Sequence, residues 1–429
     1  NVTPPNKVTG HRGKELVNTY LGGDGPVGKL TSPEFTIERN HINFLIGAGN
    51  HEGKTCMNLL VDGKIVRSAI GPALKNDQGQ EVMDWTSWDV QELKGKQATL
   101  QIVDDHSGGW GHINVDQILQ SDTPNKPSDP DFARRTDPKL RNVSLVPKFT
   151  FSETLEEQEK ELADNPLLAR FAESRKLLLE DPHYPRYHFS SPEHRLNDPN
   201  GLCYWKGKWH LFYQGYPPED PRQHWGHAVS DDLIHWRDLP YAIYPNPERA
   251  CYSGSALVEE DRVIAMYHGT TVGSMVAVSD DPLLLNWKKV TGQAVIPHAP
   301  NLPYNIFDPC IWKQGDYYYA LTAGRKPHPE HGKSVRAEFL HRSKDLAKWQ
   351  YLHTFLENDR WARVGDDGAC PYFWPIGTGK HRKHILLHFS HKRGGMYMLG
   401  DYDTERDKFA VSHGADFNHG PVGPGGVHA

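Results

Sequence analysis

Residues 28–121 carry an alternating pattern of apolar and polar positions that is typical of β-strands. The candidate strands are residues 35–39, 42–46, 56–61, 64–67 and 97–103. The pair Asp62-Gly63 stands between two of these apolar runs and predicts a tight hairpin, because a type I′ turn requires positive φ at both central residues. We therefore predict a β-sandwich domain over residues 1–121.

The pattern changes over residues 122–186, which we interpret as a linker with short helices. Five prolines stand among polar residues before position 150. Helical periodicity follows over residues 152–163 and 166–179. Thr154 with Glu157 forms a capping box, and Asn165 supplies a cap before a proline at the first helical position. We expect these helices to pack between the two domains.

From residue 187 to residue 429 the chain repeats a unit of strand, tight turn and strand. The copies are residues 201–213, 254–267, 308–321 and, more loosely, 371–389. A second element, which starts at a serine and ends at a tryptophan, interleaves with the first. Its copies are residues 230–236, 279–287 and 343–349. A repeat of about 50–60 residues with paired hairpins is the signature of a β-propeller blade.

The repeats account for about four blades, and no obvious closing strand follows them. Either a four-bladed ring closes with the segment around His188, or the chain is a fragment whose remaining blade lies on other residues or on a second chain. We favour the fragment, and a homo-oligomer is left open as a separate alternative. The expected fold class is all-β, a sandwich joined to an incomplete propeller.

Charge and hydropathy exclude two classes of protein. The chain holds 48 Lys and Arg against 54 Asp and Glu, a formal net charge of −6, whereas a nucleic-acid binder should show a basic surplus. No run of about 18 apolar residues exists, so we expect no membrane-spanning helix. The five cysteines form no CxxC pair, which argues against a structural zinc site.

Acidic residues stand where the innermost strands of the propeller begin. Asp198 precedes the first hairpin, Asp308 opens the third, and Asp366 and Asp367 precede the fourth. These positions converge on the axis of a propeller, so the carboxylates should meet in one funnel. Carboxylates held together shift each other's pKa, which separates acid and base roles. The alternative is that the Asp-Pro pairs are only turn or capping sequences.

Six ordered motifs resemble those of glycoside hydrolase family 32, the invertases, inulinases and levanases. They are Leu196-Asn-Asp-Pro-Asn-Gly201, Tyr213-Gln214, Trp225-Gly-His-Ala228, Tyr252-Ser-Gly-Ser255, Phe307-Asp-Pro309 and Ala369-Cys-Pro371. The resemblance implies a five-bladed propeller followed by a C-terminal β-sandwich, and the N-terminal sandwich is similar to an extra module of some bacterial levanase-like members.

The resemblance also implies roles for individual residues. Asp198 would be the nucleophile that attacks a fructosyl unit, and Asp308 would stabilise the transition state. The residues expected to contact the sugar are Asn197, Gln214, Trp225, Ser255 and Phe307. The implied reaction is hydrolysis of β-fructosides with retention, which uses two carboxyl groups and needs neither metal nor organic cofactor. The implied partner is a fructose-containing sugar or fructan, which fits a secreted or periplasmic protein.

Two positions depart from the family pattern. Ala369 stands where the family has the glutamate that serves as acid and base, and Phe307 stands where it has an arginine. Asp366 or Asp367 is the candidate replacement for the acid. Three hypotheses follow, namely a hydrolase with a relocated acid, an inactive sugar-binding relative, or a hydrolase whose substrate has a leaving group that needs less help. A protein-interaction scaffold is a weaker alternative.

Histidine clusters add one further consideration. His328 and His331 form one group, and His381, His384, His388 and His391 form another. Without a helix or nearby cysteine and aspartate partners, we interpret them as surface or packing residues and predict no metal site.

Overall fold

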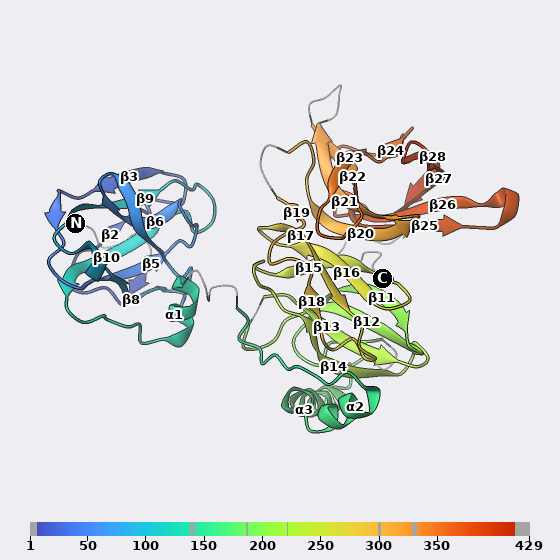
Figure 1. Cartoon of the computed structure of the whole chain (residues 1–429), viewed down its shortest axis with the longest axis horizontal. Helices are drawn as coiled ribbons and strands as arrows, with labels where there is room; N and C mark the ends of the chain where they lie inside the picture. Colours follow the sequence, from blue (N-terminus) through green and yellow to red (C-terminus); the bar gives the residue numbers. More distant parts are fainter. Residues whose placement is uncertain are drawn as a thin grey trace. The chain divides into compact units, whose positions relative to one another are not determined.

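The computed structural model describes most of the chain. The described residues are 7–137, 140, 143–185, 188–220, 222–298, 302–327 and 333–416. The chain divides into two compact units, Asn1–Val143 (unit 1) and Ser144–Ala429 (unit 2), which Figure 1 shows with their separate sheets. Nearly all of the regular structure is strand, so the prediction of an all-β fold is confirmed. His328 and His331 lie outside the described residues.

Unit 1 is built from two sheets. Its strands are β1 (Val8–Thr9), β2 (Val17–Asn18), β3 (Gly28–Thr31), β4 (Phe35–Thr36), β5 (His41–Ala48), β6 (Thr55–Val61), β7 (Lys64–Ile70), β8 (Glu81–Asp89), β9 (Gln97–Asp104) and β10 (Ile113–Ser121). One sheet has the order β1-β8-β5-β10-β2, and the other has the order β3-β9-β6-β7 with β4 paired to β9. A short 3-10 helix, Gln91–Leu93, connects β8 to β9.

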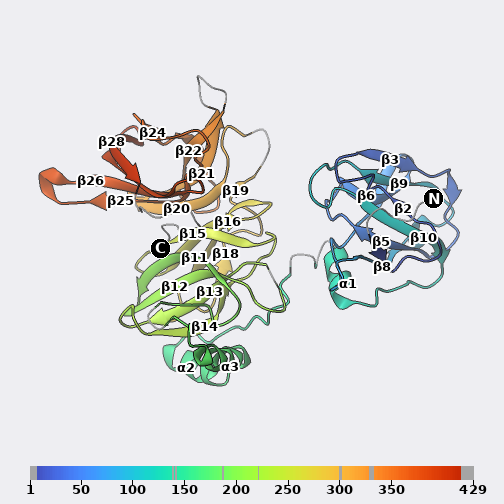
Figure 2. The same cartoon turned by 180° about the vertical axis from the view of Figure 1, so that it is seen from behind.

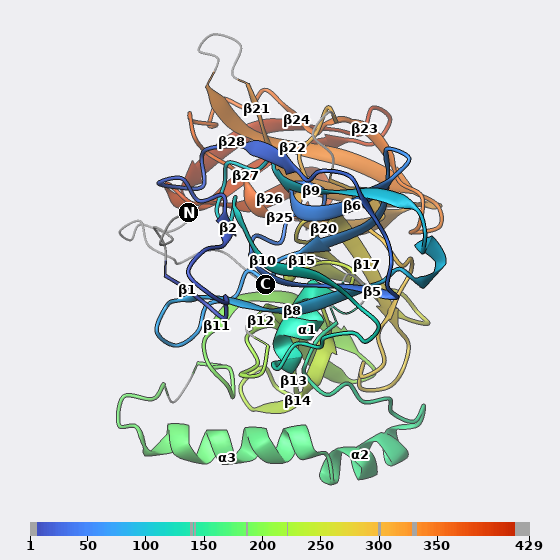
Figure 3. The ribbon, with the colours of Figure 1, turned by 90° about the vertical axis from the view of Figure 1, so that its left-hand side faces the viewer.

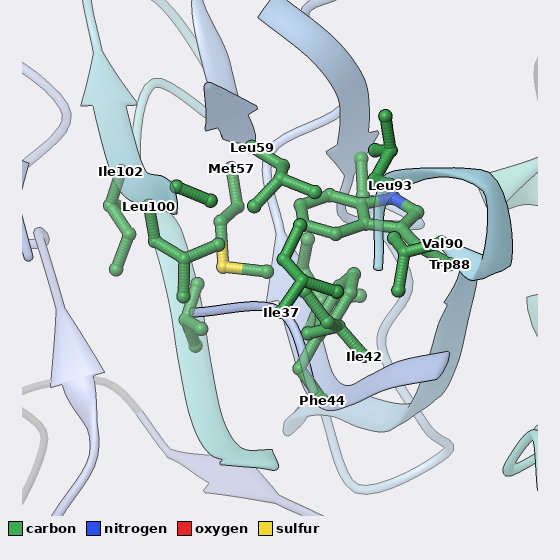
Figure 4. Packing of buried hydrophobic residues seen from close by; sticks show 14 of the residues in the cluster. Ile37, Ile42, Phe44, Met57, Leu59, Trp88, Val90, Leu93, Leu100 and Ile102 are labelled. Carbon is green, nitrogen blue, oxygen red and sulfur yellow. The ribbon is translucent and has the colours of Figure 1, made fainter. Parts of the chain in front are cut away.

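The two sheets of unit 1 enclose one apolar core, which Figure 4 shows from close by. Phe44 and Trp88 reach it from the first sheet, and Met57 and Leu100 reach it from the second. Full burial of a side chain of this size contributes about 1.5–3 kcal/mol. Strand β9 alternates between buried and partly exposed positions over its first half, as its sequence predicts, whereas β5 and β6 are buried along most of their length because smaller apolar clusters cover their other faces.

The hairpin predicted at Asp62-Gly63 is confirmed. Strands β6 and β7 pair antiparallel on either side of it. Asp62 has φ 51° and Gly63 has φ 72°, the left-handed conformations that a type I′ turn requires.

A helix that the sequence analysis missed lies in the stretch predicted as a linker. This helix, α1 (Pro130–Thr136), begins after Asp129, whose side chain accepts a hydrogen bond from the Asp131 amide at 2.8 Å. Phe132 is fully buried in the core of unit 1. A proline fits the first position of a helix as well as a loop, so the proline count alone misled the prediction. Residues 122–186 are divided between the two units.

Two further helices begin at the predicted caps. They are α2 (Leu155–Ala163) and α3 (Pro166–Glu180). Thr154 Oγ1 accepts a hydrogen bond from the Glu157 amide at 3.4 Å, and Asn165 Oδ1 accepts one from the Leu167 amide at 3.0 Å. Both helices belong to unit 2, and Figure 3 shows them end to end along one edge of its sheets. Phe171 of α3 packs against Tyr241 of unit 2.

The described part of unit 2 contains four sheets. Its strands are β11 (Leu196–Trp205), β12 (Lys208–Gly215), β13 (His224–Ser230), β14 (Trp236–Ile243), β15 (Cys251–Val258), β16 (Val263–Gly269), β17 (Gly273–Ser279), β18 (Lys288–Lys289), β19 (Ile296–Pro297), β20 (Phe307–Gln314), β21 (Tyr317–Pro327), β22 (Ser334–Ser343), β23 (Gln350–Thr354), β24 (Leu356–Glu357), β25 (Ala369–Ile376), β26 (Lys383–Ser390), β27 (Gly394–Asp403) and β28 (Lys408–Asp416). These strands pair antiparallel except for β24, which pairs parallel with β28. A 3-10 helix, Gly379–His381, connects β25 to β26.

Each sheet contains one copy of the predicted hairpin repeat. The first sheet has the order β11-β12-β13-β14 and the third β20-β21-β22-β23. The second has the order β15-β16-β17-β18 with β19 on β17, and the fourth the order β24-β28-β27-β26-β25. The four sheets follow one another through unit 2 (Figure 2). The strand that begins the hairpin repeat of each sheet is called its first strand; these are β11, β15, β20 and β25, and they contact each other in that order. The resemblance implies five blades, and four are among the described residues.

The second repeated element forms the same turn in three sheets. A leucine in the left-handed region occupies each turn, with φ values of 66° at Leu233, 52° at Leu284 and 65° at Leu346. Each tryptophan indole N–H donates to the carbonyl of the leucine three residues earlier: Trp236 to Leu233 at 3.2 Å, Trp287 to Leu284 at 2.8 Å and Trp349 to Leu346 at 2.8 Å. The serine-to-tryptophan spacing is therefore a structural signature of the turn.

No helix among the described residues combines the length and the apolar character needed to cross a lipid bilayer.

Candidate active site

The first strand of each sheet in unit 2 is irregular near its beginning. The pairing register shifts between Leu196 and Pro199 in β11, between Cys251 and Gly254 in β15, between Phe307 and Pro309 in β20, and between Ala369 and Tyr372 in β25. Asp308 and Cys370 have positive φ values of 41° and 48° within these irregularities. A bulge redirects the side chains of its strand, so these residues leave the regular alternation of a sheet.

A pocket of about 600 Å³ lies at these irregular strand ends. Its polar lining consists of Asn197, Asp198, Gln214, Gln223, Ser253, His268, Asp308 and His391. The rest of its lining consists of Tyr252, Phe307, Ala369, Cys370 and Phe389. All four sheets contribute, and the carboxylates of Asp198 and Asp308, far apart in the sequence, share this pocket.

Asp198 lies at one end of a chain of hydrogen bonds. Ser253 Oγ donates to Asp198 Oδ2, and Gln214 Nε2 lies 3.5 Å from the same oxygen. Gln214 Nε2 also donates to Ser253 Oγ at 2.8 Å, while its Oε1 accepts from Asn197 Nδ2 at 3.1 Å. These donors fix the direction of the Asp198 carboxyl group in the pocket.

The thiol of Cys370 lies between the two carboxylates. Its Sγ is 3.7 Å from Asp198 Oδ2 and 3.6 Å from Asp308 Oδ2, and its amide donates to Asp308 Oδ2 at 3.3 Å. Burial, together with the negative charges of Asp308 and Asp198, raises the pKa of the Cys370 thiol well above its ordinary value. The thiol therefore stays protonated, and its single S–H lies within reach of either carboxylate.

His268 faces the second carboxylate. Its Nδ1 is 3.8 Å from Asp308 Oδ1, and its ring lies edge-on to Tyr252 with centroids 5.6 Å apart. The imidazole therefore belongs to the Asp308 side of the pocket.

The two candidate acids, Asp366 and Asp367, are absent from the lining of the pocket in the described part of unit 2. Asp366 is buried and accepts from Arg393 Nη2 at 2.7 Å and from Ser390 Oγ at 2.9 Å. Burial alone would raise the pKa of Asp366, but these donors hold it below its ordinary value. Asp366 thus remains an anion, because it is ion-paired with Arg393 and accepts a hydrogen bond from Ser390 inside the unit.

Asp367 is held by donors as well. It accepts from the backbone amide of His391 at 3.2 Å, from His391 Nδ1 at 2.6 Å and from Arg325 Nη2 at 3.2 Å. Its carboxylate is therefore directed at His391, and His391 rather than Asp367 lines the pocket.

Two residues expected to contact the sugar lie elsewhere. Trp225 is fully buried in the core between the first two sheets, where its Nε1 donates to the Tyr252 carbonyl at 2.9 Å. Ser255 Oγ accepts from the Ile311 amide at 3.0 Å and so links β15 to β20. Both residues support the wall of the pocket, and neither is among its lining residues.

The five cysteines are free, buried thiols. Among the described residues, no group of three or more histidine, cysteine, aspartate or glutamate side chains is arranged to hold a metal ion.

The sequence model of the glycosyl hydrolases family 32 N-terminal domain matches residues 188–422. The chain belongs to glycosyl hydrolase family 32. The match covers the four sheets of unit 2 and every residue that lines the pocket.

Curated relatives of this family 32 chain include fructoside-cleaving enzymes. The chain is 32% identical over 258 residues to an insoluble beta-fructofuranosidase isoenzyme of Arabidopsis thaliana, an alignment that covers 53% of the chain and 45% of that protein. It is 29% identical over 252 residues to the levanase of Bacillus subtilis, which covers 52% of the chain and 35% of the levanase. A shorter alignment to a putative glycosyl hydrolase of Aspergillus rugulosus is 48% identical over 118 residues, 28% of the chain and 16% of that protein. The chain thus spans half or less of each of these relatives.

Among solved structures, the chain is similar to the GH32 beta-fructofuranosidase of Bombyx mori. The identity is 29%, the TM-score is 0.47, and the comparison covers 60% of this chain and 58% of that one.

Within this family 32 site, Ala369 and Phe307 form an apolar side of the pocket. Ala369 is 2% exposed and packs with Cys370, Tyr372 and Phe389, and Phe307 packs against the same cluster. This side therefore offers neither a carboxyl group nor a guanidinium group to a sugar.

Sequence reasoning missed several lining residues. Ser253 stands in the same motif as Ser255, and the motif alone did not show which serine faces the pocket. His391 was visible as one of four histidines in its region, but nothing in the sequence separated it from the others.

Proposed function

We propose that the chain is a retaining glycosidase that acts on β-fructosides of the sucrose, levan or inulin type. The observation that carries the proposal is the meeting of Asp198 and Asp308 at Cys370 in one pocket of a family 32 chain. In this mechanism Asp198 attacks the anomeric carbon of a fructosyl unit and forms an ester. Asp308 binds the sugar hydroxyls and stabilises the positive charge that develops in the transition state. Water then cleaves the ester.

The surroundings of Asp198 support this assignment. Ser253 and Gln214 hold its carboxylate in one orientation, and Cys370 adds a neutral donor. These contacts hold the carboxylate of the proposed nucleophile in one direction. A role on large fructans fits a secreted or periplasmic protein, because a polymer of this size stays outside the cell until it is cleaved.

Replacement of Asp198 by asparagine tests the proposal. Asp198→Asn should abolish release of fructose from sucrose, levan and inulin, because an amide cannot form the ester. The matched control is Asp231→Asn, an exposed aspartate of the same sheet whose side chain is 79% exposed. This control should keep the wild-type rate. Unchanged turnover in Asp198→Asn would contradict the proposal.

A second candidate function is carbohydrate binding without catalysis. The observation in its favour is the apolar side formed by Ala369 and Phe307, since Ala369 holds no proton to transfer. Calorimetry with fructo-oligosaccharides, combined with a sensitive assay for released fructose, separates the two functions. Binding with no release of fructose over long incubation would favour this second candidate.

A further inference from the structure

A histidine, His391, lies in the turn directly after β26, the strand that pairs with Ala369. Strand β25 begins at Ala369, and Ala369 pairs with Phe389 of β26. Asp367 lies two residues before Ala369, and His391 lies two residues after Phe389. The antiparallel register therefore brings Asp367 and His391 together beside Ala369, and His391 lines the pocket that holds Asp198 and Asp308.

Asp367 fixes the orientation of His391. One carboxylate oxygen accepts from the His391 amide at 3.2 Å and the other accepts from Nδ1 at 2.6 Å. Asp367 is 6% exposed, whereas the His391 side chain is 69% exposed. The Nδ1–H of His391 thus donates its hydrogen bond to Asp367. The other ring nitrogen, Nε2, is the one that can exchange a proton with solvent or with a bound molecule. A carboxylate behind an imidazole is the arrangement that orients a histidine for general acid and base catalysis.

Other titratable groups of the pocket are less suited to protonate a leaving group. Cys370 lies between the two carboxylates and keeps its proton, because burial and both negative charges raise the pKa of its thiol. His268 has Nδ1 directed at Asp308 Oδ1, 3.8 Å away, on the side of the stabilising carboxylate. Of the two histidines among the described lining residues, His268 belongs to the second sheet and His391 directly follows β26, which pairs with the strand of Ala369.

On the basis of the fructosidase function proposed above, we propose that His391 is the general acid and base of this site and that Asp367 is its positioning residue. In the first step Asp198 bonds to the fructosyl anomeric carbon while the bond to the leaving oxygen breaks. The proton of His391 Nε2 passes to that oxygen. In the second step a water molecule attacks the anomeric carbon, His391 takes a proton from the water, and Asp198 leaves as a carboxylate.

The experiment compares two substrates with different leaving groups. Sucrose needs a proton on its leaving oxygen, whereas a nitrophenolate leaves p-nitrophenyl β-fructofuranoside without one. His391→Gln should lower kcat/KM for sucrose by about 10²–10⁴-fold, the usual worth of general acid catalysis, and should change kcat/KM for the nitrophenyl substrate only slightly. Asp367→Asn should lower kcat/KM for sucrose by a smaller factor with the same dependence on the leaving group.

A matched control exists on the surface of the first sheet. His235 Nδ1 bonds to Asp232 Oδ2 at 2.7 Å, and the His235 side chain is 86% exposed, so the pair reproduces the geometry of His391 and Asp367 away from the pocket. His235→Gln should leave both substrates unaffected. A thermal unfolding curve of His391→Gln that matches the wild type shows that the variant is folded.

The possible outcomes separate this proposal from the one on which it rests. Equal rates for wild type and His391→Gln on sucrose, or equal losses on both substrates, would overturn the role of His391 while the fructosidase function stands. If the wild type releases fructose from neither substrate, the proposed function fails and the role of His391 fails with it.

Discussion

Acidification should destabilise unit 2 but not unit 1. The reason is that the fold lowers the pKa of buried histidines in unit 2 and raises the pKa of a buried histidine in unit 1. In unit 2, burial lowers the pKa of His224 to about 4, and it lowers the pKa of His341 to about 4 as well. His224 Nδ1 bonds to the Arg222 carbonyl at 2.9 Å and Nε2 to Ser144 Oγ at 2.6 Å, so the neutral ring is already satisfied. The unfolded chain has a histidine pKa of about 6.5.

The sign follows from where the proton binds. Between pH 6.5 and 4 these histidines bind protons in the unfolded chain but stay neutral in the folded unit. The free energy of unfolding therefore falls as the pH falls. Each such histidine contributes a loss of at most about 1.4 kcal/mol per pH unit, and about 1.6 kcal/mol between pH 6.5 and 5, because the unfolded histidine is only half protonated at pH 6.5. His224 and His341 share no hydrogen-bond partner, so the losses from these two residues add to about 3 kcal/mol, or a fall in Tm of roughly 6–12 °C.

In unit 1 the pKa of the buried His112 is shifted in the opposite direction, upward. Burial would lower the pKa of His112, but Glu81 and Asp24 bind its two ring nitrogens and raise it. Its contribution to stability is complete below the unfolded pKa and is lost as the pH rises through the folded pKa. Acidification from pH 6.5 to 5 therefore leaves this contribution in place.

Calorimetry of the full chain at several pH values between 6.5 and 5 measures these responses, in a range above the ordinary titration of carboxyl groups. One transition should fall steeply with pH, and His224→Asn should reduce its slope by about 1.4 kcal/mol per pH unit, whereas the exposed His235→Asn should not. Transitions that keep their temperatures across this range would refute the view that these histidines stay neutral in the folded unit.

Two further variants distinguish residues that line the pocket, which affect catalysis, from residues behind its wall, which affect stability. Ser253→Ala removes the hydroxyl that donates to Asp198 and should lower kcat/KM for sucrose by about 10–100-fold, the worth of one hydrogen bond to a charged group, with an unchanged melting temperature. Steady-state kinetics check this, and a wild-type rate would contradict it. Trp225→Phe removes the indole N–H that donates to the Tyr252 carbonyl and should lower the free energy of unfolding by about 1–2 kcal/mol in a denaturant titration. A raised KM with unchanged stability would show instead that Trp225 contacts the sugar.

The sequence predicted the architecture well where the signal was local and repeated. The hairpins of unit 2 and the turn at Asp62-Gly63 depend on residues close together in the chain, so their patterns could be recognised directly. Helix α1 was missed because its prolines fit both a linker and a helix start.

The site was harder to predict because it depends on register. Residues two apart in a regular strand share a face, which would put Ser253 and Ser255 side by side. The shift between Cys251 and Gly254 separates them, so that Ser253 lines the pocket and Ser255 links two strands. The proximity of His391 to Ala369 likewise follows from the pairing of β25 with β26, which no single-residue pattern reveals.

The irregular beginnings of the four first strands have an evolutionary consequence. Each sheet lends the pocket a few side chains from a bulged segment, while its regular hairpin pairing begins beyond them. A mutation in one bulge can therefore change the reactive groups without loosening the sheet that carries it. Ala369 and Phe307 lie in two such segments. Substitutions at the irregular end of each sheet can thus change the chemistry of the pocket one sheet at a time while the fold stays the same.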